Sequence, residues 1–193
     1  MVLRAVASAG MVLAATLMGG LTACAQEPPA PQQIAGAVSP LPEAMRDGAT
    51  VLGYRRGKLV ALRQGTNEMI CLADDPSQAG FHAACYHRDL EPFMARGRAL
   101  RAEGKERPAI DSVRAAEIAS GALAMPREPR ALYSLSSKQE FDPAAGIAPE
   151  SSGLQVVYMP YATEESTGIS ATPGPGPWLM FPGKPWAHLM IAR

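Results

Sequence analysis

Cysteines and histidines stand close together in the segment 69–104, and these residue types can form disulfides, bind metals or transfer protons. Cys71 and Cys85 flank a turn, and His82 and His87 lie on either side of the second cysteine. Thiolates and neutral imidazoles are the usual protein ligands of zinc and copper. In a protein that works outside the reducing cytosol, however, two cysteines more often pair with each other.

A hairpin centred on Gln78 favours the disulfide. The runs 69–73 and 82–86 have the length and composition of strands, and the turn between them contains Pro and Gly. In the register that this turn sets, Cys71 lies directly opposite Cys85. Opposed residues in an antiparallel pair have Cα atoms close enough for a disulfide. We therefore predict a Cys71–Cys85 disulfide.

The metal alternative would use Cys71, Cys85 and His87. Strand alternation places these three side chains on one face and His82 on the other, so at most three ligands converge. Their spacing matches no zinc pattern built from two close ligand pairs. The sequence thus predicts no metal or other cofactor, and metal handling stays as an alternative.

The same register opposes Asp74 and His82 on the other face of the hairpin. A carboxylate beside an imidazole can orient a general base, although it can also be a surface ion pair of little energetic value. His188 is the third histidine. The chain has no G-x-S-x-G, S-x-x-K, H-E-x-x-H, P-loop, dinucleotide or C-x-x-C motif. Asp74, His82 and His188 are therefore candidates for a hydrolase-like enzyme without an assigned nucleophile, and the sequence favours binding over catalysis.

Aromatic residues flank a long polar loop at 163–176. Tyr161 precedes this Gly- and Pro-containing segment, and Trp178 and Trp186 follow it. Aromatic side chains beside such a loop suit contact with a ligand or partner, and they equally suit a core next to a loop.

The elements that must position these residues are short. Eight runs have strand character, at 49–55, 58–63, 69–73, 82–86, 132–135, 154–159, 178–181 and 188–192. A helix is predicted from Asp89 or Glu91 to about Gly104, and a second one from Asp111 to Ser120. This order predicts an α+β fold, with an antiparallel sheet of about six to eight short strands and two helices in the middle of the chain, on one face of the sheet.

Local details sharpen this prediction. The first four strands are expected to form an antiparallel meander with a hairpin turn at Arg56-Gly57. Gly97 lies on the apolar stripe of the first predicted helix, where Ala would be about 1 kcal/mol more favourable. The close approach of another backbone would explain this glycine.

The first 25 residues have the layout of a secretory signal peptide. Arg4 precedes a mostly apolar run at 5–18, which is shorter than the roughly 20 residues of a membrane-spanning helix. The motif Leu21-Thr22-Ala23-Cys24 resembles the lipobox of bacterial lipoproteins. The resemblance implies that Cys24 is lipidated, that it becomes the mature N-terminus, and that the protein is held at the outer membrane.

Ordinary cleavage is the alternative, because Ala23-Cys24-Ala25 also fits an A-x-A site. Cleavage after Ala25 would release a soluble periplasmic protein, so both alternatives export the chain. Residues 26–40 are rich in proline and predict a tether, partly in polyproline II conformation. Residues 41–193 are then expected to form a single domain, long enough to bury one core.

Composition limits the partners. Hydrophobic residues make up 47% of the chain, and Lys plus Arg and Asp plus Glu both number 18. Loss of Arg4 with the signal peptide leaves 17 basic and 18 acidic residues, a net charge of −1 that gives no general attraction to nucleic acid. We therefore predict an exported binding or interaction module of the cell envelope, attached to the membrane through Cys24 and partnered by an envelope ligand or protein.

Overall fold

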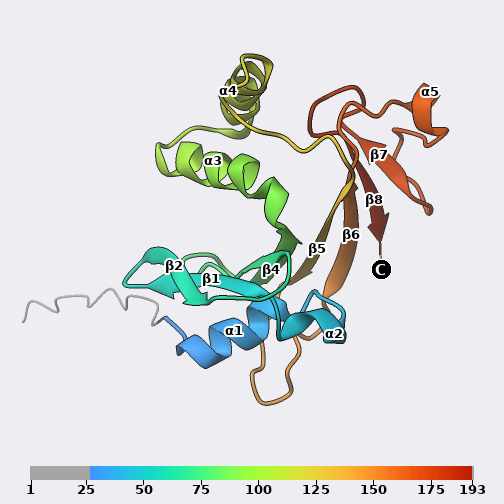
Figure 1. Cartoon of the computed structure of the whole chain (residues 1–193). Coiled ribbons are helices and arrows are strands. Elements are labelled where there is room, and N and C mark those ends of the chain that lie inside the picture. The colour runs from blue at the N-terminus through green and yellow to red at the C-terminus, as the bar shows by residue number, and fades with distance from the viewer. Residues whose placement is uncertain (1–26, 193) are drawn as a thin grey trace, which may run out of the picture.

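A single eight-stranded sheet organises the chain in the computed structural model, which describes residues 27–192 (Figure 1). The strands follow the order β2-β1-β3-β4-β5-β6-β8-β7. They are β1 (Thr50–Arg55), β2 (Lys58–Arg63), β3 (Met69–Leu72), β4 (Phe81–His87), β5 (Arg130–Ser137), β6 (Ser152–Tyr158), β7 (Trp178–Met180) and β8 (His188–Ala192). The α+β fold predicted from the sequence is confirmed, and each of the eight predicted runs overlaps one of these strands.

The hairpin registers follow the sequence closely. Arg55 pairs with Lys58, and Arg56 and Gly57 between them both have positive φ, as a two-residue hairpin turn requires. Cys71 pairs with Cys85 across β3 and β4, and the two cysteines form a disulfide with Cα atoms 4.0 Å apart. The predicted disulfide is therefore present.

The prediction of a simple meander is wrong in one place, because β1 and β3 run parallel. After β2 the chain folds back over the start of β1, where the carbonyl of Gly48 accepts hydrogen bonds from the backbone N–H groups of Thr66 and Asn67. Gly65 makes this return possible, since a Cβ there would lie 2.3 Å from the carbonyl oxygen of Gly48. The return brings β3 beside β1 in the same direction.

A helix occupies most of the segment predicted to be a tether, and that prediction is wrong for these residues. Helix α1 (Ala30–Val38) has Pro29 as its N-cap and Pro31 in its first turn, where a missing N–H costs nothing. Ala37 is fully buried, and its carbonyl oxygen lies 3.1 Å from Sγ of Cys85. The folded domain therefore begins before residue 41, and the disulfide packs under α1.

The two helices predicted for the middle of the chain lie together on the opposite face, as expected, and α1, which was not predicted, covers the other face (Figure 1). A 3-10 turn, η1 (Arg88–Leu90), leads into α3 (Glu91–Ala102), and α4 (Arg107–Ala119) follows. The second helix begins four residues before the predicted Asp111, because Pro108 fits the first turn and Asp111 lies inside the helix. The remaining helices, α2 (Glu43–Arg46) and α5 (Glu164–Thr167), are single turns.

Strand alternation divides the core into an α1 side and an α3 side. The disulfide, Ala37, Val51 and their neighbours pack on the α1 side. Tyr86, Phe93 and Trp186 belong to the cluster under α3 and α4. Across residues 27–192, no helix combines the length and the apolar character needed to cross a membrane.

Candidate functional site

The cysteines and histidine of the metal alternative do not form a metal site. Cys71 and Cys85 are bonded to each other, so neither offers a thiolate. His87 instead lies beside Asp89, with Nδ1 accepting a hydrogen bond from the Asp89 backbone N–H at 3.2 Å. Among residues 27–192, no group of three or more His, Cys, Asp or Glu residues is arranged to hold a metal ion.

Asp74 and His82 are neighbours, but not as a carboxylate–imidazole pair. Oδ1 of Asp74 accepts a hydrogen bond from the backbone N–H of His82 at 2.8 Å. The His82 imidazole lies on the other side of the strand, where Nδ1 is 2.8 Å from Oγ of Ser136. The carboxylate therefore binds the backbone of the turn and not the ring. Asp74 lies beyond the last pair of the β3–β4 ladder, Leu72 with Ala84.

The aromatic candidates separate in the structure. Tyr161 is 59% exposed, and Trp178 is partly buried on β7. Trp186 is only 5% exposed and packs against Phe93 beside α3. His188 is also buried, with Nδ1 2.7 Å from the carbonyl oxygen of Trp186, and burial lowers the pKa of its imidazole. These residues do not form one surface patch.

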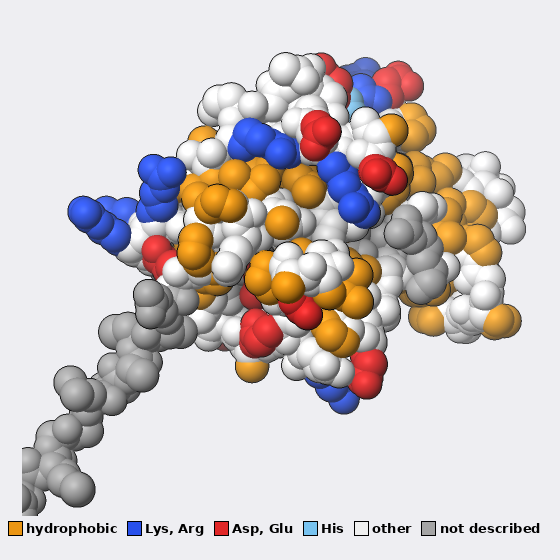
Figure 2. Space-filling view, turned by 90° about the horizontal axis from the view of Figure 1, so that it is seen from below, with side chains coloured by type: hydrophobic (Ala, Val, Ile, Leu, Met, Phe, Trp, Pro, Cys, Tyr) orange, Lys and Arg blue, Asp and Glu red, His pale blue; other side chains and the backbone are white. Residues whose placement is uncertain are grey.

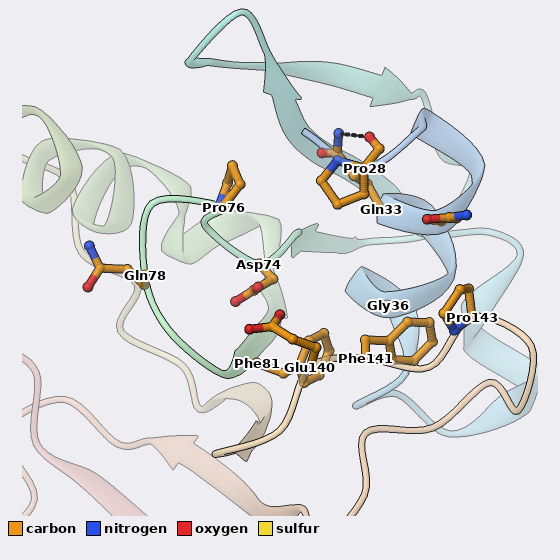
Figure 3. Close-up of a pocket in the computed structure, with 11 residues that line it drawn as sticks. Pro28, Gln33, Gly36, Asp74, Pro76, Gln78, Phe81, Glu140, Phe141 and Pro143 are labelled. Carbon is orange, nitrogen blue, oxygen red and sulfur yellow. Dashed lines mark hydrogen bonds between the residues drawn. The ribbon is translucent and has the colours of Figure 1, made fainter. Parts of the chain in front are cut away.

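Asp74 lies instead in a cavity of about 240 Å³, which we call the acidic pocket. Three segments form it: α1, the turn between β3 and β4, and the start of the loop that follows β5 (Figure 3). Its lining residues are Pro28, Gln32, Gln33, Gly36, Asp74, Pro76, Gln78, Phe81, Glu140, Phe141 and Pro143. None of these residues is basic, so neither Asp74 nor Glu140 has a basic neighbour in the lining.

The two carboxylates of the pocket point toward each other in Figure 3. Burial, and to a smaller extent the charge of Glu140, raises the pKa of Asp74 above its usual value, against the opposing effect of the His82 N–H. Glu140 is held by the backbone N–H of Gly80 at 3.2 Å. Gly80 has φ of +80°, and a Cβ there would lie 2.5 Å from the carbonyl oxygen of Ser137, so this position requires glycine.

Aromatic rings form the apolar wall of the pocket. Phe81 and Phe141 stack with ring centroids 5.3 Å apart, and Gly36 of α1 leaves room for them, since a Cβ there would lie 3.2 Å from the Phe81 ring. Figure 2 shows the α1 side of the molecule, where hydrophobic side chains gather with both acidic and basic side chains beside them. Pockets that combine apolar walls with a few convergent polar groups and a perturbed pKa are typical ligand sites.

Sequence reasoning identified Asp74 but missed Glu140 and Phe141. Both lie in the loop after β5, more than 65 positions from Asp74, in a segment without any motif. No family model, curated protein or solved structure was found to match this chain. The geometry of the pocket therefore carries the functional argument.

Proposed function

We propose that this protein is an exported binding module of the cell envelope that holds a cationic ligand with an apolar body in the acidic pocket. The observation that carries the proposal is the convergence of Asp74 and Glu140 on a cavity with stacked phenylalanines and no basic lining residue. The disulfide-braced domain supplies the rigid support for this pocket.

The electrostatics of the pocket favour a cation. Two nearby carboxylates repel each other, and burial makes the ionised form of Asp74 still less favourable. A bound ammonium group would offset the repulsion and donate charge-assisted hydrogen bonds to both carboxylates. The Phe81–Phe141 wall would bury the apolar part of the ligand, at about 25 cal/mol per Å² of apolar surface.

The size of the pocket limits the ligand. Its volume of about 240 Å³ lies below the roughly 300 Å³ at which pockets begin to enclose drug-sized molecules. We infer that it receives a small amine or a single basic side chain of a larger partner.

The proposed lipid anchor would hold this pocket close to the membrane. Glu27 is bound to the β1–β2 hairpin through the backbone N–H groups of Arg56, at 2.7 Å, and Gly57. Three Cα-to-Cα steps separate Cys24 from Glu27, and each spans about 3.8 Å, so the chain reaches about 11 Å at most. Pro28 follows Glu27 and lines the acidic pocket. A ligand at the membrane surface would therefore reach the acidic pocket directly.

Palmitate labelling tests the anchor. In cells that express the full chain, we expect label on the wild-type protein and none on Cys24→Ser. The labelled protein should fractionate with membranes. An unlabelled wild-type protein would contradict the lipid anchor and leave the soluble periplasmic form.

Titration with benzylammonium tests the pocket. We expect saturable binding to the wild-type protein, weaker by about tenfold or more in Glu140→Gln and Asp74→Asn, because each removes one charged acceptor. Glu165→Gln is the matched control, since Glu165 is exposed on α5 and does not line the pocket. Equal affinity in all four proteins, or no binding at millimolar benzylammonium, would overturn the proposed function.

A further inference from the structure

A second cleft lies on the opposite side of the sheet, between α3, α4 and the strands β6 and β8. We call it the arginine cleft; its volume is about 220 Å³. Its lining includes four arginines (Arg98, Arg101, Arg107 and Arg114) and no acidic residue. Neither the disulfide nor the acidic pocket requires such a concentration of positive charge on this side of the sheet.

Arg114 is the central residue of the cleft. It is only 7% exposed, and its guanidinium carbon lies 3.8 Å from the centroid of the Phe93 ring. Nη2 donates to Oδ1 of Asp111 at 2.7 Å, and Nη1 donates to the carbonyl oxygen of Phe93 at 3.4 Å. Gly97 of α3 makes space for this group, because a Cβ there would lie 2.9 Å from Nη1. The guanidinium is thus held in one place.

Two donors in the cleft have no acceptor. Among the side chains of residues 27–192, the buried nitrogen and oxygen atoms without a hydrogen-bond partner are Nε of Arg114 and Nε1 of Trp186. Buried donors are nearly always paired, since an unpaired one loses its hydration without compensation. Both residues line the same cleft, and the Arg114 guanidinium carbon lies 6.0 Å from the Trp186 ring centroid. The two unpaired N–H groups therefore belong to neighbouring residues that line one cleft.

The charge around these donors is positive overall. Asp111 accepts from both Arg107, at 2.9 Å, and Arg114, so one carboxylate serves two guanidinium groups. Arg98 is paired with Glu91. Arg101 is exposed at the rim and has no ion-pair partner within residues 27–192.

We infer that the arginine cleft binds an organic oxyanion, namely a carboxylate or phosphate group attached to a small planar apolar group. The oxyanion accepts hydrogen bonds from Nε of Arg114 and Nε1 of Trp186, and Arg101 and Arg107 supply further positive charge. The rings of Phe93, Tyr158 and Trp186 enclose the apolar part. This site is independent of the acidic pocket and of the cationic ligand proposed there.

The indole N–H of Trp186 provides a direct measurement. The chain has two tryptophans, so a ¹H–¹⁵N spectrum of the purified full-length protein contains two indole signals, and Trp178→Phe assigns them. We expect benzoate and phenyl phosphate to shift the Trp186 indole signal to lower field in a saturable way and to leave that of Trp178 in place. Benzamide, which lacks the charge, and inorganic phosphate, which lacks the ring, should bind at least about tenfold more weakly.

Substitutions at the cleft complete the test. Arg114→Gln is expected to weaken benzoate binding by about tenfold or more. Because Arg114 is buried, Arg101→Gln is the second variant: it lies at the exposed rim and should weaken binding with unchanged thermal stability. Arg55→Gln, exposed on β1 outside the cleft, is the matched control and should bind as the wild type does.

Several outcomes would overturn the inference. They are an unmoved Trp186 signal at millimolar benzoate and phenyl phosphate, equal binding of benzamide, equal binding of inorganic phosphate and phenyl phosphate, or unchanged affinity in both arginine variants. Glu140→Gln separates this site from the acidic pocket, since it should reduce benzylammonium binding and leave benzoate binding intact.

Discussion

In the proposed function, Asp74 serves ligand binding at some cost to the stability of the free protein. Its carboxylate caps the turn before β4 through the His82 N–H, yet burial and the neighbouring Glu140 disfavour its charge. A neutral side chain of the same shape would keep the hydrogen bond and remove the unfavourable charge. The charged form is therefore better suited to a cationic ligand than to the stability of the free protein.

Asp74→Asn is expected to raise the free energy of unfolding at neutral pH. The raised pKa means that the folded state holds a proton on Asp74 at pH values where the unfolded chain has lost it. The ionised group therefore lowers stability fully above its folded pKa. This loss shrinks as the pH falls through the folded pKa and is gone below the pKa of the unfolded chain. Urea denaturation at about pH 7 and near the ordinary aspartate pKa of about 3.9 measures the effect.

The difference between Asp74→Asn and the wild type should shrink at the lower pH, and Glu165→Gln should show no such trend. An Asn variant that is less stable than the wild type at neutral pH would contradict the assignment of Asp74 as an unfavourably placed charge.

Gly97 and Arg114 form a pair that a double-mutant cycle can measure. At an ordinary helix position Gly→Ala adds about 1 kcal/mol of stability. Here the new Cβ would lie 2.9 Å from Nη1 of Arg114, which Phe93 and Asp111 hold in place, so we expect Gly97→Ala to bring no gain or a loss.

In the Arg114→Gln background the side chain is shorter, and the same substitution should stabilise by up to about 1 kcal/mol. Thermal or urea unfolding of the four proteins gives the coupling energy. Identical effects of Gly97→Ala in both backgrounds would mean that the glycine does not serve to accommodate Arg114.

At the scale of elements, α1 decides the shape of the acidic pocket, and Gln33 attaches it to the sheet. Nε2 of Gln33 donates to the carbonyl oxygens of Pro28, at 2.8 Å, and Tyr54, at 3.0 Å, while Oε1 accepts from the Tyr54 N–H at 2.7 Å. Gly53 of β1 leaves space for this amide, since a Cβ would lie 2.6 Å from Oε1. The helix is thus joined to β1 by specific hydrogen bonds as well as by apolar contacts.

Gln33→Leu is expected to destabilise the protein by about 1–3 kcal/mol, because it leaves the polar backbone groups of Tyr54 without their partners. It should also weaken benzylammonium binding, as the pocket wall loosens. Gln32→Ala, on an exposed position of the same helix, is the control and should change stability by no more than about 0.5 kcal/mol. Equal stabilities of the two variants would exclude Gln33 as the attachment of α1.

At the scale of the whole molecule, the disulfide joins the strands at the centre of the α1 side of the core. Cys71 and Cys85 are fully buried and separated by 14 positions in the chain. Closing a loop of this length limits the unfolded chain and is worth about 3 kcal/mol. The bond also supports both ends of the turn that carries Asp74.

Replacement of both cysteines by alanine is therefore expected to lower the free energy of unfolding by about 3 kcal/mol or more, measured by urea denaturation. Intact mass and thiol titration of the wild-type protein should show no free thiol at either position. A double variant as stable as the wild type would contradict this account of the disulfide.

The sequence by itself determined the local features of this protein. Strand alternation and turn residues placed all eight strands, the Arg56-Gly57 turn and the pairing of Cys71 with Cys85, because each depends on neighbours along the chain. The export signal and Cys24 lie outside the described residues, so the lipid anchor stays a prediction. The prolines led to the wrong prediction of a tether at residues 30–38. Proline disfavours the interior of a helix but not its first turn, and the structure has a helix there.

Only the tertiary structure decided which distant residues meet. Glu140 joins Asp74, and Trp186 joins Arg114, after the chain has crossed the sheet, and Gly97 meets Arg114 where α3 packs against α4. None of these contacts leaves a periodic signal in the sequence. The parallel pairing of β1 and β3 and the covering of both sheet faces arise in the same way, from contacts between segments far apart in the chain. Both ligand sites proposed for this protein consist of such contacts, and for that reason the sequence alone indicated Asp74, His188 and Trp186 without the residues that complete their surroundings.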